Sequence, residues 1–403
     1  MRDLKHLTYF EDLLQEANNA LVVQAQAEGK KCVAFVCENT PEPLMNLDNT
    51  FGVRLHAPNT GSMDIATYYM TSLLCETSRS LLERAVEGGF NFADCVIAPD
   101  GCTMINRCVE NMELLKTMGA GKDHFFYEYM EIPLKADDNG VDLLVLQCKN
   151  HILKPLHDAF GTDVSDAAIR RAVAEHNRVC ELIRAIGEYR KGDNPRITGY
   201  EFHVIQLCTQ TCPKDLILPY LRETLQELRE RQPDPKPWYR ARILIAGSEI
   251  DDPEFTKMLE MAGGMVVADR YCFGSMPGRE EIPLEEGKDV LQSIADYYMW
   301  RNQCPRAMGP ENIIARKKYI FDLAEKYRAD GIIVENMKFC EYWGYERAQD
   351  GMWFYEGYEL PRSIPVCQIE KDYTSAASGQ LRTRFQAFIE SVEIKKIQEG
   401  VKR

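Results

Sequence analysis

The chain has 403 residues, of which 45% are hydrophobic and 27% are charged, a balance typical of a folded globular protein. This excludes a disordered or fibrous chain, and the length predicts two or three domains. The formal net charge is −14, so a nucleic-acid backbone would be repelled and nucleic acid is not expected as a partner.

Targeting signals are not expected in this sequence. Residues 1–31 alternate charged and apolar residues at helical spacing and lack a small-residue cleavage site, so they do not resemble a signal peptide. No uncharged apolar run approaches the ~18 residues of a membrane span. We therefore expect a cytoplasmic protein, whose fourteen cysteines serve core packing, metal binding or catalysis rather than a disulfide network.

Short β-branched and apolar runs alternate with helical patterns in the two outer parts of the chain, which predicts α/β structure with two open parallel sheets. The predicted strands are 32–37, 92–98, 242–246, 264–268, 331–335 and 364–369. The middle of the chain has helical periodicity, and a proline-rich linker follows at 231–238. The predicted domains are an N-terminal α/β domain at 1–150, a helical domain with linker at 151–237, and a C-terminal α/β domain at 238–403.

Three cysteines occupy similar places, just after predicted strands. Cys102 follows a Pro-Asp-Gly turn, Cys272 comes four residues after a strand that ends near Ala268, and Cys340 comes five residues after Glu335. In open parallel sheets, ligands bind beyond the carboxyl ends of strands, so cysteines from two domains can face one another across a cleft. Thiolates suit zinc, copper(I) or an iron–sulfur cluster. The alternative from spacing alone is three unrelated buried thiols.

With these residues in view, the chain resembles the 2-hydroxyacyl-CoA dehydratase and benzoyl-CoA reductase family over nearly its whole length. The resemblance is strongest in DGIIVENMKFCEYWGYE, where Lys338, Phe339 and Cys340 match the family's Lys-Phe-Cys ligand segment, and in the closing segment SIPVCQIEKDYTSAASGQLRTRFQAFIE. VIAPDGCTMINR and GSEIDDPEFTKMLEMAGGMVVADRYC resemble the segments that carry the other two ligands. The chain departs from some catalytic subunits of the family at AFVCENTPEP and LHAPNTGS.

The resemblance implies two flavodoxin-like parallel-sheet domains that clasp a 4Fe-4S cluster on Cys102, Cys272 and Cys340, plus a helical domain. It implies a lyase, namely a subunit of an ATP-activated radical 2-hydroxyacyl-CoA dehydratase that works without oxygen. The implied partners are a paralogous subunit in a heterodimer, an ATP-dependent iron–sulfur activator and an acyl-CoA substrate. Glu335 and Lys338, near the third cysteine, are the candidate catalytic residues.

Two other functions stay open at this point. One is a reductase of the same family, acting on an aromatic acyl-CoA or, with a double cluster, on a small unsaturated molecule. A double cluster needs more cysteine ligands in the cleft, for which Cys37, Cys108 and Cys304 are candidates. The other is a non-catalytic subunit that relays electrons and binds no acyl-CoA.

Overall fold

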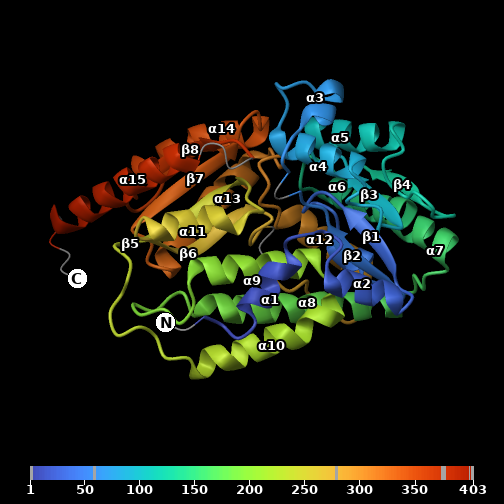
Figure 1. Cartoon of the computed structure of the whole chain (residues 1–403), viewed down its shortest axis with the longest axis horizontal. Helices are drawn as coiled ribbons and strands as arrows, with labels where there is room; N and C mark the ends of the chain where they lie inside the picture. The colour runs from blue at the N-terminus through green and yellow to red at the C-terminus, as the bar shows by residue number, and fades with distance from the viewer. Residues whose placement is uncertain (1–2, 58–59, 277–279, 374–377, 399, 401–403) are drawn as a thin grey trace.

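The computed structural model describes residues 3–57, 60–276, 280–373, 378–398 and 400. Two four-stranded sheets stand side by side above a layer of helices, with the N-terminal half of the chain in one sheet and the C-terminal half in the other (Figure 1). This confirms the α/β class and the two parallel sheets.

The two sheets have the same topology. The first has the order β2-β1-β3-β4 and the second the order β6-β5-β7-β8, and every strand pair is parallel. The strands are β1 (Lys31–Phe35), β2 (Thr50–Arg54), β3 (Cys95–Pro99), β4 (Phe126–Met130), β5 (Ala241–Glu249), β6 (Gly264–Cys272), β7 (Gly331–Met337) and β8 (Val366–Lys371). In each sheet the second strand is added on one side of the first, and the third strand is added on the other side. Flavodoxin-like folds have the same change in strand order, and ligands bind at this point.

The six predicted strands are all present, and two further strands escaped prediction. β4 is an edge strand whose sequence FYEYM is only partly buried, so it has no continuous apolar run. β2, TFGVR, is fully buried but contains a glycine and ends in an arginine. Both strands therefore lack the pattern by which the other six were recognised.

Helices cover both faces of the two sheets. In the N-terminal half they are α1 (Leu7–Leu13), α2 (Ala20–Ala27), α3 (Asp64–Tyr69), α4 (Glu76–Val86), α5 (Thr103–Leu114), α6 (Asp138–Cys148) and α7 (Lys154–Phe160), with a 3₁₀ turn η1 (Glu42–Met45) and a π turn η2 (Lys149–Leu153). In the C-terminal half they are α11 (Pro253–Met261), α12 (Val290–Trp300), α13 (Pro310–Lys326), α14 (Glu341–Asp350) and α15 (Ser378–Gln398), with a π turn η3 (Gly351–Tyr355).

The middle of the chain forms three long helices, α8 (Asp166–Glu188), α9 (Gly199–Thr211) and α10 (Lys214–Glu230), as the periodicity predicts. They form the lower layer of Figure 1 and share one apolar core with α1. α9 begins with a capping box between Thr198 and Glu201, which satisfies backbone donors at the helix start. The C-terminal half also contributes to the first sheet's core, because its helix α12 packs on α6 of the N-terminal half. Because core packing crosses positions 150 and 237, the three-domain division stays a prediction.

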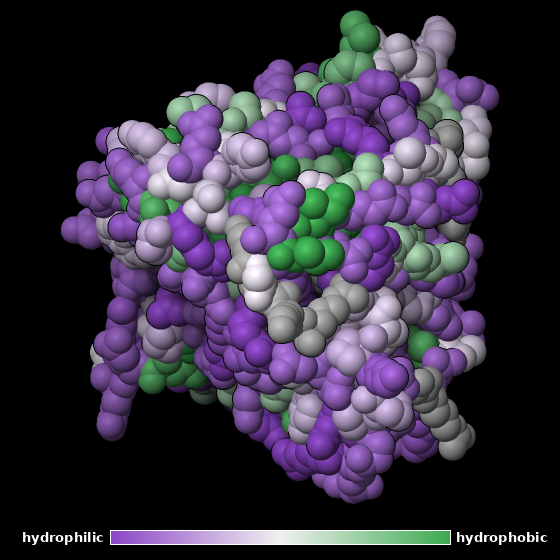
Figure 2. All heavy atoms as spheres, turned by 90° about the vertical axis from the view of Figure 1, so that its left-hand side faces the viewer, coloured by the Kyte–Doolittle hydropathy of each residue, from purple (hydrophilic) through white to green (hydrophobic). Residues whose placement is uncertain are grey.

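The surface is largely hydrophilic on the side that Figure 2 shows. The face at the left of Figure 1 is mostly hydrophilic, with hydrophobic side chains in small separate groups (Figure 2). Among the described residues, no helix combines the length and the apolar composition that crossing a membrane requires.

Candidate functional site

A cavity of about 100 Å³ lies between the two sheets, near the carboxyl ends of their strands. Its walls come from both halves of the chain and include Cys102, Cys272 and Cys340, the three cysteines singled out in the sequence. The first comes from the segment after β3, the second is the last residue of β6, and the third follows β7. The tertiary structure thus brings these three thiols to one site.

The expected strand ends need a correction. β6 continues through Cys272 and β7 continues to Met337, whereas the sequence indicated ends near Ala268 and Glu335. The reason is that each strand carries a buried charged residue two positions before its end, Arg270 in β6 and Glu335 in β7. A polar residue near a strand end suggests a loop in the sequence, because the distant residues that contact it in the fold are not visible there.

Three more cysteines line the same cavity: Cys37 after β1, Cys75 before α4 and Cys304 after α12. Cys37 and Cys304 were candidates for further ligands, while Cys75 was missed. Cys108, the remaining candidate, is fully buried in the core of the first half and is not among the residues that line the cavity.

Cys75, Cys102 and Cys340 form what we call the first triad. Each is the N-cap residue of a helix, α4, α5 and α14 respectively. Helix N-termini carry partial positive charge and free N–H groups, which favour thiolates and other anions. The Ile105 N–H donates to Cys102 Sγ at 3.5 Å. The pKa of Cys340 lies well above its usual value because of burial, and the neighbouring Cys75 and Cys102 raise it further.

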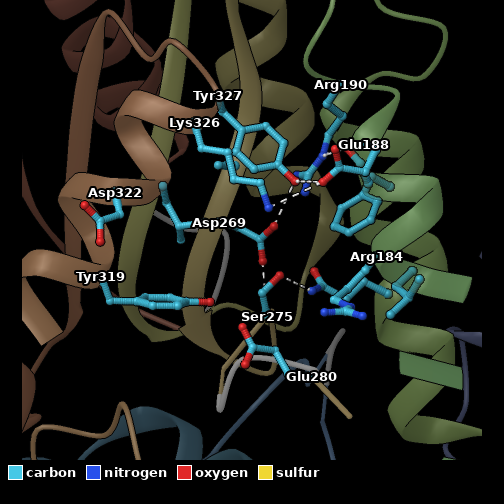
Figure 3. Close-up of a pocket in the computed structure, with 16 residues that line it drawn as sticks. Arg184, Glu188, Arg190, Asp269, Ser275, Glu280, Tyr319, Asp322, Lys326 and Tyr327 are labelled. Carbon is cyan, nitrogen blue, oxygen red and sulfur yellow. Dashed lines mark hydrogen bonds and ion pairs between the residues drawn. The ribbon is translucent and has the colours of Figure 1, made fainter. Parts of the chain in front are cut away.

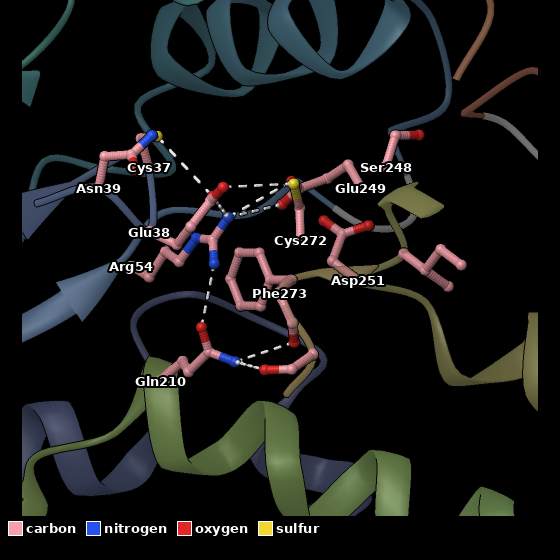
Figure 4. A network of polar contacts seen from close by, with 12 residues as sticks. Cys37, Glu38, Asn39, Arg54, Gln210, Ser248, Glu249, Asp251, Cys272 and Phe273 are labelled. Atoms are coloured by element: carbon pink, nitrogen blue, oxygen red, sulfur yellow. Dashed lines mark hydrogen bonds and ion pairs between the residues drawn. The ribbon is translucent and has the colours of Figure 1, made fainter. Parts of the chain in front are cut away.

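Cys37, Cys272 and Cys304 form the second triad. Burial raises the pKa of Cys37 and of Cys272 well above the usual value, and Glu38 and Cys304 add to both shifts. Glu38 lies between two of the thiols: Cys272 Sγ is 3.5 Å from one of its carboxyl oxygens and Cys37 Sγ is 3.7 Å from the other (Figure 4). Cys340 of the first triad packs against the cluster that holds Cys272 and Cys304, so the two triads are adjacent in one cavity.

A buried arginine ties the second triad to the helical layer. Arg54, 1% exposed, donates to Glu38 at 3.2 Å, to Glu249 at 3.3 Å and to Gln210 of α9 at 3.0 Å (Figure 4). Its guanidinium carbon lies 4.1 Å from the ring centroid of Phe273, the residue after Cys272. This network joins both sheets and the helical layer at the cavity, so buried hydrogen bonds and ion pairs stabilise the cavity wall.

The backbone is strained beside two of the cysteines. Phe273 and Phe339, which flank Cys272 and Cys340, are non-glycine residues with φ of 62° and 64°. This left-handed conformation is costly for a residue with a side chain and is found most often at functional sites. Here it turns the chain sharply where each thiol enters the cavity.

The donor set fits a multinuclear sulfur-ligated group. Within the described ranges, no three His, Cys, Asp or Glu side chains converge closely enough to hold a single metal ion. Six thiols spread around one cavity are instead the soft ligands that an iron–sulfur cluster takes, with one sulfur at each ligated iron. Their raised pKa values mean that metal binding would release protons from them.

The two candidate catalytic residues lie in different environments. Glu335 is fully buried and accepts hydrogen bonds from the backbone N–H and the hydroxyl of Ser248, both at 2.9 Å. Burial raises its pKa to about 7. Ser248 lines the cavity, so Glu335 sits directly behind the wall. Lys338 has a 46% exposed side chain that pairs with Asp372 at 3.4 Å. The catalytic role of both residues stays a prediction.

A second cavity, of about 300 Å³, lies between α8 and α13 (Figure 3). Its lining includes no cysteine, and two of its cations are paired, Arg190 with Asp269 at 3.1 Å and Lys326 with Glu188 at 3.5 Å. We therefore assign the candidate site to the thiol-lined cavity.

The sequence pattern of the 2-hydroxyglutaryl-CoA dehydratase D-component family matches residues 36–392. The chain belongs to this family. The match begins just after β1 and covers the other seven strands, the three long helices α8, α9 and α10, and all six cavity cysteines. It confirms the family that the Lys-Phe-Cys segment and the closing segment indicated.

Curated relatives include both dehydratase and reductase subunits. The chain is 24% identical to the (R)-phenyllactyl-CoA dehydratase beta subunit of Clostridium sporogenes, over 96% of this chain and 99% of that protein. It is 25% identical to the putative dehydratase subunit YjiM of Escherichia coli, over 75% of each chain. It is 19% identical to one of the benzoyl-CoA reductase subunits of Thauera aromatica, over 68% of this chain and 69% of that protein.

Proposed function

We propose that this chain is the iron–sulfur subunit of an ATP-activated radical 2-hydroxyacyl-CoA dehydratase, and that its thiol-lined cavity holds the cluster. The observation that carries the proposal is the first triad. Three cysteines from both sheets each begin a helix and line one cavity, so three positive helix ends favour an anionic, thiolate-ligated group there. Family membership and the dehydratase relatives support the same reaction.

The reaction explains why such a site is needed. The β-hydrogen of a 2-hydroxyacyl-CoA is hardly acidic, so simple base-catalysed loss of water fails. One electron added to the thioester carbonyl gives a ketyl radical anion that expels the 2-hydroxyl group, after which the β-proton is acidic enough to leave and the electron is recovered. When bound, the cluster supplies single electrons and, at an iron without a protein ligand, a Lewis acid for substrate oxygen.

The chain's own residues provide the setting for that chemistry. Residues of both sheets line the cavity, a placement that would restrict the access of water and oxygen, to which a radical is sensitive. Glu335, with its raised pKa and its two hydrogen bonds from Ser248, is the proposed group that holds or moves a proton at the cavity wall. Lys338 lies on the surface, where its proposed contribution is to the acyl-CoA rather than to the cavity.

A second candidate function is a reductase with a double cluster, and the second triad favours it. Cys37, Cys272 and Cys304 provide three more thiols beside the first triad, which is the ligand number that a second cubane sharing the cavity would need. In this arrangement Cys75, Cys102 and Cys340 would hold one cubane, and Cys37, Cys272 and Cys304 would hold the other. The similarity to a benzoyl-CoA reductase subunit agrees with reductive chemistry.

Iron counting distinguishes the two functions. The full chain is purified without oxygen, and iron and acid-labile sulfide are measured per chain for wild type and for alanine variants of each of the six cysteines. About four iron atoms, lost with Cys102 or Cys340 but kept in Cys37→Ala and Cys304→Ala, support the dehydratase with one cluster. Loss of iron in Cys272→Ala would support the predicted set of Cys102, Cys272 and Cys340, and loss in Cys75→Ala would support the first triad. About eight, with losses in both triads, support the double-cluster reductase. A stable wild type without iron would overturn both proposals.

The proposed partners are a paralogous subunit and a separate ATP-hydrolysing iron–sulfur activator. We expect dehydration of an acyl-CoA only when both are added to this chain, with ATP and a reductant. A subunit that only relays electrons would instead hold the cluster and show no thermal shift with any acyl-CoA.

A further inference from the structure

A cluster of buried charges lies behind the cavity, beneath α14. It consists of Arg270, Arg316, Lys317, Glu346 and Asp350, whose residues are at most 2% exposed. Arg316 donates to Glu346 through two nitrogens at 3.1 and 3.2 Å, and Lys317 contacts both Glu346, at 2.6 Å, and Asp350. Three cations therefore face two carboxylates, which leaves one positive charge in excess.

The excess charge is that of Arg270. One nitrogen of its guanidinium donates to the carbonyl of Gln303, whereas Nε and Nη1 have no hydrogen-bond partner among the described residues. Among the described residues, Arg270 forms no salt bridge of 4.0 Å or less, although its side chain is fully buried. Burying a cation with unsatisfied donors is costly unless a negative group lies near it.

Arg270 is directed toward the thiols. It lies on β6, two residues before Cys272, and its bonded carbonyl belongs to the residue before Cys304. Its guanidinium carbon is 5.1 Å from the ring centroid of Trp343. Trp343 lines the cavity and packs in one cluster with Cys272 and Cys304, with Cys340 against it. The same aromatic ring therefore lies beside this cation and packs with three of the six thiols.

We propose that the buried positive charge of Arg270 balances the negative charge of the iron–sulfur cluster in the cavity and thereby raises the reduction potential of the cluster. The inference rests on the proposed function, since it requires a cluster on these thiols. Thiolate ligation makes the cluster negative, and reduction adds one more negative charge. A buried cation near the cluster stabilises the reduced form more than the oxidised form, because little solvent screens the interaction.

The test is a redox titration of the full chain, purified without oxygen at pH 8 and followed by visible absorption and electron paramagnetic resonance. Arg270→Gln removes the charge, Arg270→Lys keeps it, and Asp350→Asn removes a carboxylate from the same charge cluster. Arg242→Gln is the matched control, because this buried arginine lies at the opposite end of the second sheet, where it donates to backbone carbonyls.

We expect Arg270→Gln to lower the ratio of reduced to oxidised cluster about tenfold at the wild-type midpoint, which is ~59 mV for one electron. Arg270→Lys and Arg242→Gln should stay close to wild type, and Asp350→Asn should move the potential upward. Full iron with an unshifted potential in Arg270→Gln would overturn the inference. If that variant loses its iron, Asp350→Asn decides: an upward shift supports the inference and an unchanged potential overturns it.

The failure of the proposed function has a different result. In that case wild type itself holds no iron, and both proposals fall together. An iron-loaded wild type with no response to the charge variants overturns only the role of Arg270.

Discussion

Cys102 and Cys340 belong to different sheets and are 238 positions apart in the sequence, yet they take the same structural role at one cavity. Each is the N-cap of the helix that follows a buried parallel strand, α5 after β3 and α14 after β7. The repeated topology of the two sheets produces this equivalence, because both place a strand end and a helix start at the same kind of position. Two halves of one chain thereby supply matching cysteines to one cavity.

Cys75→Ala tests the ligand that sequence inspection missed. We expect a loss of roughly half of the iron in a double-cluster protein and of nearly all iron in a protein with one cluster, since the first triad loses one of its three thiols. Iron and sulfide per chain are the measurement. Cys108→Ala is the control, because that buried thiol lies in the core on the helix that Cys102 caps. Equal iron in wild type and Cys75→Ala would remove Cys75 from the site.

Gly101→Ala tests the position of the second triad without removing a thiol. A Cβ atom at Gly101 would lie 3.0 Å from Cys37 Sγ, so that the thiol must move by a few tenths of an ångström. We expect lower iron content from the second triad and unchanged iron on the first. Gly344→Ala is the matched control, since a Cβ there meets nothing within 4 Å and the residue lies one helical turn after Cys340. Full iron in both variants would argue against ligation by Cys37.

The raised pKa of Glu335 predicts that the free energy of unfolding depends on pH. Burial raises its pKa from 4.5 to about 7, so the folded state holds the proton more tightly than the unfolded state does. Its contribution therefore favours folding at low pH and is lost as the pH rises from 4.5 to 7. Glu335→Gln removes this dependence, and between pH 4.5 and 7.5 its free energy of unfolding should gain roughly 3 kcal/mol relative to wild type. Anaerobic urea titrations at several pH values measure the difference, and parallel pH profiles for the two proteins would contradict it.

Lys338→Gln separates stability from catalysis at the other candidate residue. The side chain is half exposed and its pairing with Asp372 is a surface ion pair, so the free energy of unfolding should change by less than about 1 kcal/mol. A large fall in acyl-CoA turnover at unchanged iron and unchanged stability would then support a role of Lys338 in the reaction. Normal turnover would assign Lys338 to the surface pairing alone.

Much of the fold could be predicted from local patterns. Six of the eight strands and the helical middle are evident because buried parallel strands are continuous apolar runs and covering helices repeat every three to four residues. β4 escaped prediction because an edge strand needs only partial burial. The last residues of β6 and β7 escaped because buried charged residues such as Arg270 and Glu335 resemble a loop when their partners are distant in sequence.

The two parallel sheets, the family and three thiols near strand ends could be predicted from local patterns, because neighbouring residues carry each of these signals. That six cysteines, Cys75 among them, line one cavity is visible only in the folded chain, because the cavity forms where separate strand ends and helix starts converge. No local pattern records which distant residues will share it, or which buried charge will stand behind it.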